Sequence, residues 1–259
     1  MKNRLFVAAM VAVSILGTGI SAQNAGEEPT VEKLLQRLLE ARGGAERWDK
    51  IKSLRIDGTW TAFSEDMPMT ILRMRPNLYR FEHTVLGAPS ILAYDGSKAW
   101  MQGAMYGAPD GQQIEDSWER NVIEESPFVC KLLDHAASGA EIELVGRQKA
   151  EGKDAYVLEV RLDDASRETW FLDADTYLET KRVSMTFDLF SGPGVELEME
   201  TFYMDFRDVD GVKIPHREER HFGTRYRVFE AASIEVNPEL NPDLFEVPEQ
   251  KEKQEGEES

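Results

Sequence analysis

Apolar and polar residues alternate along most of the chain. In the segment 78–83, with the sequence L-Y-R-F-E-H, every second residue would face the same side of an extended strand. This period of two predicts half-buried β-strands between Met69 and Met101. Two turn signals divide that stretch. Pro76-Asn77 is one because proline donates no N–H, and Asp95-Gly96 is the other because both residues tolerate positive φ.

The same alternation begins at Ser53 and returns in the second half of the chain. From Ile142 to Val236 the apolar positions predict a long antiparallel meander. Its hairpin turns are indicated by Glu151-Gly152, by the Asp-rich segment 173–176 and by Asp210-Gly211. About eleven strands are expected in total.

Helical spacing is confined to two parts of the chain. Val31 to Leu39 reads as a helix with Thr30 as its N-cap and Gly43-Gly44 as its end, and a short helix is expected over 45–52. A Gly/Pro/Ala-rich loop is predicted over 103–111. Two further helices are then expected, one around Ile114–Val122 and one that begins at Ser126-Pro127 and stops at Ser138-Gly139.

Many strands with helices in only two insertions indicate the α+β class, with a mostly antiparallel sheet. Strict alternation means that one face of the sheet is buried and the other is wet. A sheet of this length must curl strongly or close on itself. The helices are expected to cover its concave face.

Composition adds limits on location and partners. The 259 residues carry a net charge of −18, so binding to a nucleic-acid backbone is not expected. Lys2 and Arg4, followed by an apolar run and a small-residue end at Ala22, predict a cleaved signal peptide over 1–22 and a soluble periplasmic protein. One domain is expected over 23–248, and the charged tail 249–259 is expected to be disordered.

Several motifs occur in an order known from one family. They are R-P-N-L-Y at 75–79, S-I-L-A-Y-D-G-S-K-A-W at 90–100, D-V-D-G-V-K-I-P-H at 208–216 and N-P-D-L-F-E-V-P at 241–248. This ordered set resembles the LolA-like periplasmic outer-membrane lipoprotein-sorting family, over nearly all of the chain after the signal peptide. The resemblance implies an unclosed, strongly curved antiparallel β-barrel whose helices form a lid over an apolar cavity. It also implies no cofactor and no catalysis.

Arg75 matches the family arginine that helps to hold the lid and to govern release of cargo, although exposed strand-end arginines are common. The predicted cavity residues are apolar side chains that adapt to a ligand or cover large areas. Any one of them alone is more often an ordinary core residue, but the group as a whole favours a cavity. These candidates are Trp60, Met69, Phe81, Trp100, Met101, Met105, Tyr106 and Trp118.

The sequence offers little support for metal or catalytic chemistry. His216 and His221 would face opposite sides of a strand, and the aspartates before Gly211 fit a hairpin turn better than a calcium loop. Cys130, the single cysteine, rules out an internal disulfide and reads as a small core residue. We therefore expect no metal site, no cofactor and no enzyme.

The leading hypothesis is a periplasmic carrier that binds the acyl chains of a lipoprotein, or a related lipid, and delivers them to the outer membrane. An inner-membrane donor and an outer-membrane acceptor would be its partners, and a monomer is expected. The alternative is a sensor or interaction module of the same fold that binds a protein partner through an exposed edge strand. A third hypothesis, an envelope hydrolase, requires a constellation of close polar side chains in the cavity.

Overall fold

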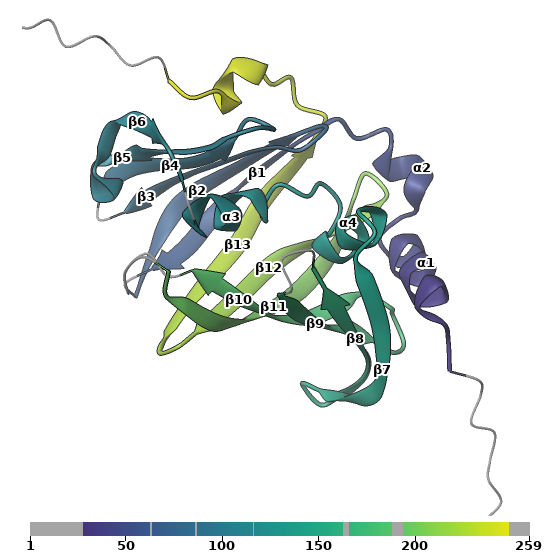
Figure 1. Ribbon diagram of the computed structural model, residues 1–259. Coiled ribbons are helices and arrows are strands. Elements are labelled where there is room, and N and C mark those ends of the chain that lie inside the picture. Colours follow the sequence, from purple (N-terminus) through teal and green to yellow (C-terminus); the bar gives the residue numbers. More distant parts are fainter. Residues whose placement is uncertain are drawn as a thin grey trace, which may run out of the picture.

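A computed structural model describes residues 28–62, 64–85, 87–115, 117–162, 166–187 and 194–248. The predicted signal peptide and the charged tail 249–259 lie outside the described residues, and those two predictions stay open. The described part of the chain forms one antiparallel sheet of thirteen strands, accompanied by four α-helices and two 3₁₀ turns (Figure 1).

The first six strands form a simple meander, and the other seven follow the helical insertion. The first group is β1 (Ser53–Ala62), β2 (Glu65–Met74), β3 (Leu78–Val85), β4 (Ala88–Tyr94), β5 (Ala99–Gly103) and β6 (Ala108–Gln113). The second group is β7 (Glu141–Ala150), β8 (Lys153–Arg161), β9 (Arg167–Asp173), β10 (Glu179–Phe187), β11 (Glu196–Val209), β12 (Val212–Phe222) and β13 (Arg225–Val236).

The strand order leaves the sheet open. It runs β6-β5-β4-β3-β2-β1-β13-β12-β11-β10-β9-β8-β7, so β6 and β7 are the two end strands and do not pair. The first and last strands meet in the middle, where Leu54 lies opposite Val236 and Trp60 opposite Phe229. The unclosed antiparallel architecture expected from the motifs is thus present, with thirteen strands in place of about eleven.

The helices occupy the interior and one end of the curved sheet. Figure 1 shows α3 (Ser117–Ile123) and α4 (Lys131–Ala137) on its concave side, where the chain crosses from β6 to β7. Helix α1 (Val31–Ala41) and the single turn α2 (Ala45–Trp48) lie at the end near β7. Leu34 and Leu38 of α1 are fully buried in a cluster that includes Leu132 of α4 and strands β8 and β9.

The N-terminal helix begins where the sequence predicts. Thr30 has extended backbone angles, and its side chain accepts a hydrogen bond from the Lys33 N–H at 3.3 Å, which satisfies one of the free amide groups of the first turn. Gly43, with φ of 116°, follows the helix end and lies so close to the Gly211 carbonyl that a Cβ would be 2.5 Å from it. The helix therefore stops where only glycine fits.

Three boundaries differ from the sequence predictions. Residues 103–111, expected as a loop, hold the 3₁₀ turn η1 (Ala104–Tyr106) and most of β6. β6 is an edge strand, where Pro109 removes no hydrogen bond that the sheet needs. The second central helix begins at Lys131 rather than at Ser126-Pro127, and α2 ends at Trp48. Side chains from other elements bind the carbonyls of the missing turns, as described below.

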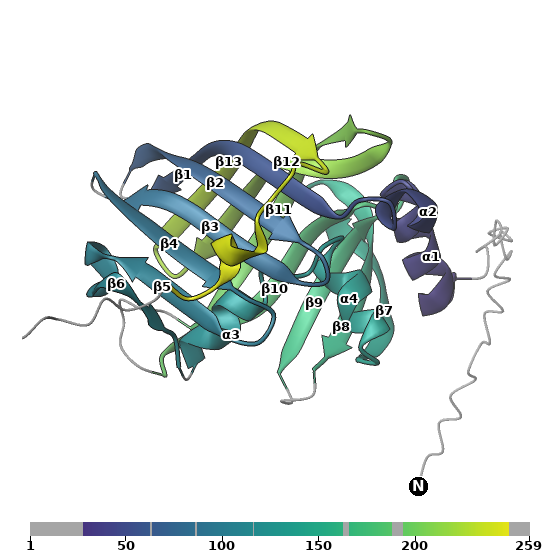
Figure 2. The same cartoon turned by 90° about the horizontal axis from the view of Figure 1, so that it is seen from above.

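The C-terminal segment covers the convex face. Figure 2 shows the 3₁₀ turn η2 (Pro242–Phe245) crossing outside β3. The indole N–H of Trp100 donates to the Phe245 carbonyl at 2.6 Å, and Arg80 donates to the Leu244 carbonyl at 2.6 Å. Strand alternation places Trp100, Ala93 and Arg80 on this outer face, because these residues lie opposite one another in register.

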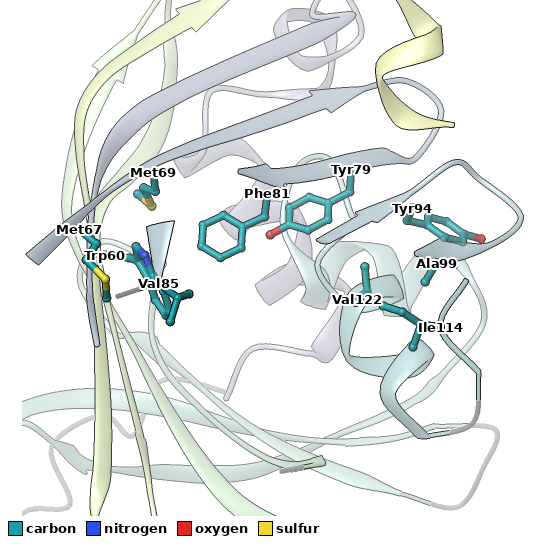
Figure 3. Close-up of a cluster of buried hydrophobic side chains, with 10 residues drawn as sticks. All are labelled: Trp60, Met67, Met69, Tyr79, Phe81, Val85, Tyr94, Ala99, Ile114 and Val122. Carbon is teal, nitrogen blue, oxygen red and sulfur yellow. The ribbon is translucent and has the colours of Figure 1, made fainter. Parts of the chain in front are cut away.

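The other face of the same strands is lined by large apolar side chains. Along β3 buried and half-buried residues alternate, and Tyr79, Phe81, His83 and Val85 form the buried set. Figure 3 shows Tyr79 and Phe81 lying between Trp60 on one side and Val122 on the other. No helix among the described residues is long and apolar enough to cross a membrane.

Candidate ligand-binding site

A cavity of about 250 Å³ lies on the concave side, between the strands on either side of the β1–β13 seam and helix α3. Its walls are mainly aromatic and aliphatic. The lining side chains from β1–β4 include Trp60, Ile71, Tyr79, Phe81, Val85 and Leu92. Met105 and Tyr106 of η1, Trp118 and Val122 of α3, and Phe187, Met199 and Phe229 of the second half complete the apolar wall.

Aromatic contacts of Trp60, at the β1–β13 seam, fix one end of this cavity. The Trp60 ring packs edge-to-face on Phe81 with centroids 5.8 Å apart, and it stacks near Phe229 at 6.4 Å (Figure 3 shows Trp60 and Phe81). Such pairs add about 0.5–1.5 kcal/mol each beyond their buried area. The pocket wall is therefore pre-formed by strands that are far apart in the sequence.

A buried polar pair interrupts this apolar wall. His83 is 4% exposed, and its Nε2 lies 2.8 Å from the hydroxyl of Tyr106. Burial lowers the pKa of the His83 imidazole from 6.5 to about 4, a nearby carbonyl at Phe81 opposes the change, and the positive charge of Arg227 adds to it. The imidazole is therefore neutral at neutral pH, and it acts as an uncharged hydrogen-bonding group in the cavity wall.

This pair predicts a pH-dependent contribution to stability. Because the folded-state pKa of His83 lies below its unfolded value, the contribution is fully present above pH 6.5 and is lost as the pH falls to about 4. The full effect corresponds to about 3 kcal/mol. The difference in unfolding free energy between wild type and His83→Phe, measured with urea, should fall by up to that amount from pH 7 to pH 4.

The same pair of proteins provides the internal control for that measurement. Between pH 7 and pH 9 the His83 ring is neutral in both the folded and the unfolded chain, so the difference should stay constant there. A difference that stays constant between pH 7 and pH 4 as well would show that the imidazole is not held neutral by burial.

A second cavity of about 130 Å³ adjoins the first, toward α1 and α4. The two cavities share a wall. It is made of Ile71 and Arg73 from β2, Glu218 and Arg220 from β12, Phe229 from β13, and Glu125 from the segment after α3. Four of these six side chains are charged. The concave space is therefore divided into two compartments by a charged partition.

The partition is built around the segment that joins α3 to α4, residues 124–130, which we call the α3–α4 connector. Arg220 donates to Glu125 at 2.9 Å and also to Glu218, and Lys131 donates to Glu125 at 2.8 Å. Burial alone would raise the pKa of Glu125, but the charges on Arg220 and Lys131 hold the pKa well below its usual range. The Glu125 carboxylate is therefore ionised inside the sheet.

A second buried ion pair holds Glu124, the neighbour of Glu125 at the start of the connector. Arg182, 1% exposed, donates to Glu124 at 2.9 Å and also to Glu168. Glu168 accepts a hydrogen bond from the indole of Trp170 at 2.8 Å, and its carboxylate lies 3.2 Å from His135. Although burial opposes ionisation, the His135 hydrogen bond and the Arg182 charge lower the pKa of Glu168 to about 2.

Three solved structures share this architecture over most of both chains. A LolA superfamily protein from Nitrosomonas europaea matches with a TM-score of 0.56 at 12% identity, over 85% of this chain and 98% of that chain. A DUF1329 family protein from Desulfovibrio piger matches with a TM-score of 0.57 at 11% identity, over 85% and 98%. A putative outer membrane lipoprotein-sorting protein domain from Vibrio parahaemolyticus matches at 0.53 and 13%, over 83% and 96%.

The chain has a LolA-like fold. No protein-family model matches the sequence, and no curated protein matches it significantly. The likeness is one of fold, because the sequence identities lie between 11% and 13%. The fold predicted from the ordered motifs is thereby confirmed.

Within this LolA-like fold the predicted cavity residues separate into four groups. Trp60, Phe81, Met105, Tyr106 and Trp118 line the larger cavity, and Met69 lines the smaller one. Met101 lies opposite Leu92 on the same face and packs against the cluster that includes Phe81. Trp100 lies on the convex face under the C-terminal segment, so the structure does not bring it to the cavity.

Arg75 lies in the turn between β2 and β3, at the end of the sheet near α2. Its guanidinium donates to the carbonyls of Ile51 and Trp48, both at 2.8 Å, and lies 4.6 Å from the ring centre of Phe128 in the connector. It touches α2 and the connector at once. This position is compatible with the predicted lid-holding role, which stays a prediction.

The charged residues of the partition were not singled out by sequence reasoning. Arg182 and Arg220 stand in strands where most charged residues face solvent, and Glu124 and Glu125 follow a short helix. The sequence carried no usable signal at Arg182, because the apolar residues Val183, Met185 and Phe187 occupy the alternate positions of β10 and Arg182 shares its face with Ser184. An arginine on the buried face of a strand requires a buried partner.

The reactive groups of the cavities do not form a nucleophilic site. Cys130 lines the smaller cavity, and burial, followed by the nearby Glu179 carboxylate, raises the pKa of its thiol to about 12. A thiol of this kind holds almost no thiolate at neutral pH. Among the described residues, no group of three or more His, Cys, Asp and Glu side chains is placed to hold a metal ion.

Proposed function

We propose that the protein is a periplasmic carrier that binds the acyl chain of a lipoprotein, or a related lipid, and carries it toward the outer membrane without catalysing a reaction. The observation that carries the proposal is the apolar cavity of about 250 Å³ on the concave face of a LolA-like sheet. Burial of an acyl chain there would contribute about 0.8 kcal/mol for each CH₂ group removed from water.

The lining chemistry favours a flexible apolar chain over a rigid polar ligand. Met105 and Trp118 approach from η1 and α3, while Phe81 and Phe229 approach from the sheet, so the ligand would lie between the two layers. Methionine adapts its shape at little cost and aromatic rings cover large areas, which suits chains of variable length. Within the aromatic part of the wall, the imidazole of His83 is hydrogen-bonded to Tyr106 through Nε2.

The test is uptake of an acyl probe by wild type and by a cavity-filling variant. Ile71 belongs to the wall between the two cavities, so Ile71→Trp should exclude at least two methylene groups and weaken binding roughly tenfold. Binding is measured by fluorescence titration, together with mass spectrometry of lipids that co-purify with the protein.

Ile91→Trp is the matched control. Ile91 is half-buried and precedes Leu92 in β4, so it points away from the cavity that Leu92 lines. This variant should bind the probe as tightly as wild type. The proposal fails if wild type carries no lipid and takes up no acyl probe, or if Ile71→Trp binds as well as Ile91→Trp.

The alternative, binding of a protein through an edge strand, has less support. The sheet ends at β6 and β7, and β7 exposes Val145 to 59%. The β7–β8 register shifts between Leu144 and Gly146, and charged residues alternate along the strand. Bulges and charges on an edge strand discourage the addition of another strand, so the cavity is the better-supported site.

A further inference from the structure

Three arginines from three different strands bind the α3–α4 connector. Arg73 of β2 donates to the Pro127 carbonyl, Arg182 of β10 to Glu124, and Arg220 of β12 to Glu125. All three point to the concave side, and Arg73 and Arg220 also line both cavities. The connector thus supplies acceptor oxygens to a set of inward-facing cations on the sheet.

These arginines need hydrogen-bond acceptors or negative charges beside them even if the connector moves away. Arg182 is almost fully buried, and the side chain of Arg220 is 19% exposed. Removing the partner of a buried ion pair typically costs about 3–5 kcal/mol, because the remaining charge is left without compensation. A connector that moved away without replacement would therefore leave a costly arrangement behind it.

A ligand of acyl-chain length requires such a movement. The cavities measure about 250 Å³ and 130 Å³, and ligand sites for drug-sized molecules are usually about 300–1,000 Å³. Among the described residues of the shared wall, Glu125 is the side chain that comes from the connector, while the others come from strands. Displacement of Glu125 would join the two cavities into one longer pocket.

The charges left on the sheet then favour one class of ligand. With Glu124 and Glu125 displaced, the arginines 73, 182 and 220 face the two carboxylates of Glu168 and Glu218. Among these five side chains, three arginines against two carboxylates leave one positive charge uncompensated. A neutral lipid would leave this imbalance in place, whereas an anionic headgroup would remove it.

We propose that the ligand is an amphiphile with an anionic headgroup, whose carboxylate or phosphate replaces Glu125 beside Arg73 and Arg220 while its acyl chain fills the joined cavities. The Glu125 carboxylate is then an internal substitute for the headgroup, which occupies the cationic site while the cavity is empty. This inference rests on the proposed carrier function and specifies the ligand class for the same site.

The test compares ligands that share a palmitoyl chain and differ in the headgroup. Palmitate carries a carboxylate, palmitoyl lysophosphatidylglycerol carries a phosphate, and monopalmitoylglycerol is neutral. Affinities are measured below the aggregation concentration through intrinsic tryptophan fluorescence, to which Trp60 and Trp118 in the cavity wall contribute. Wild type should bind at least one anionic probe roughly tenfold more tightly than the neutral probe, the value of one charge-assisted hydrogen bond.

Substitutions test which residues cause the preference for an anionic headgroup. Arg220→Gln should reduce the ratio of anionic to neutral affinity roughly tenfold, and Glu125→Gln should raise it, because the competing carboxylate is gone. Arg73→Gln is the second variant if Arg220→Gln does not fold, since Arg73 binds a carbonyl and leaves no carboxylate unpaired. Arg217→Gln is the matched control, because Arg217 lies on β12 and pairs with Glu219 and Glu230 on the other face.

The outcomes separate this inference from the proposed function. Equal affinity for anionic and neutral probes, or an unchanged preference in both Arg73→Gln and Arg220→Gln, overturns the headgroup assignment and leaves the carrier proposal standing. A protein that binds none of the three probes overturns both. Preference for palmitate alone, or for the lysophospholipid alone, supports the assignment and identifies the headgroup as carboxylate or phosphate.

Discussion

Replacement of Arg182 by methionine is expected to lower the free energy of unfolding by about 3–5 kcal/mol. Arg182 is 1% exposed and holds both Glu124 and Glu168, and the Glu168 side chain is itself 3% exposed. Without the arginine, the Glu168 carboxylate must either remain charged in a buried environment or take up a proton. Urea denaturation at pH 7 measures the loss.

A double variant distinguishes loss of a charge partner from loss of packing. In Arg182→Met/Glu168→Gln both charges are gone, and the glutamine can still accept the hydrogen bond from Trp170. At least half of the lost stability should return, because buried ion pairs can often be replaced by neutral groups at little cost. No recovery in the double variant would mean that Arg182 acts through packing against Trp170.

The matched control is the exposed pair of Arg55 and Asp57, whose side chains are 43% and 38% exposed and lie 2.6 Å apart. Arg55→Met should change stability by less than about 1 kcal/mol, as is usual for ion pairs in contact with solvent. A loss of that small size in Arg182→Met would contradict the view that the buried pair secures the connector to the sheet.

Replacement of Trp100 by alanine should also lower the free energy of unfolding by a large amount, while the affinity for the ligand is preserved. Trp100 is fully buried on the convex face, and its indole holds the Phe245 carbonyl at 2.6 Å. Truncation of a buried tryptophan typically costs about 3–5 kcal/mol. Because the ring lies on the face opposite Tyr79 and the cavity, the folded variant should bind the acyl probe within about twofold of wild type.

Trp118→Ala should show the opposite pattern. Trp118 is half-buried on α3 and lines the larger cavity, so its loss should weaken probe binding roughly tenfold with a smaller cost in stability. Thermal denaturation and fluorescence titration on the same two variants give both quantities. A loss of probe affinity in Trp100→Ala beyond its unfolded fraction would place that indole in the ligand path.

The elements that were predictable from sequence are those fixed by local chemistry. The alternation in 78–83, the Asp95-Gly96 and Asp210-Gly211 turns and the Thr30 cap all act through neighbours within a few residues, and the structure has them where they were expected. The apolar wall followed from the same alternation, since Trp60 and Phe81 occupy inward positions of their strands.

The parts that could not be predicted depend on partners far away in the chain. The segment from Ser126 has the residues of a helix start, yet its Pro127 and Val129 carbonyls accept hydrogen bonds from Arg73 and Arg42 instead of continuing a helix. Trp100 and Trp118 have the same side chain and lie close in sequence. Strand register places Trp100 on the convex face, whereas helix α3 carries Trp118 into the cavity wall.

The pairing of β1 with β13 has a consequence for how the sheet can form. Every other pair in the sheet joins strands that are neighbours in the sequence, so β1–β6 and β7–β13 can each assemble through local hairpins. The β1–β13 seam joins the two ends of the domain, and the entropy of closing that long loop must be overcome before the cavity has a continuous wall. Formation of the ligand site is therefore tied to the slowest kind of contact in the chain, and a partly folded molecule would have two separate curved sheets and no pocket.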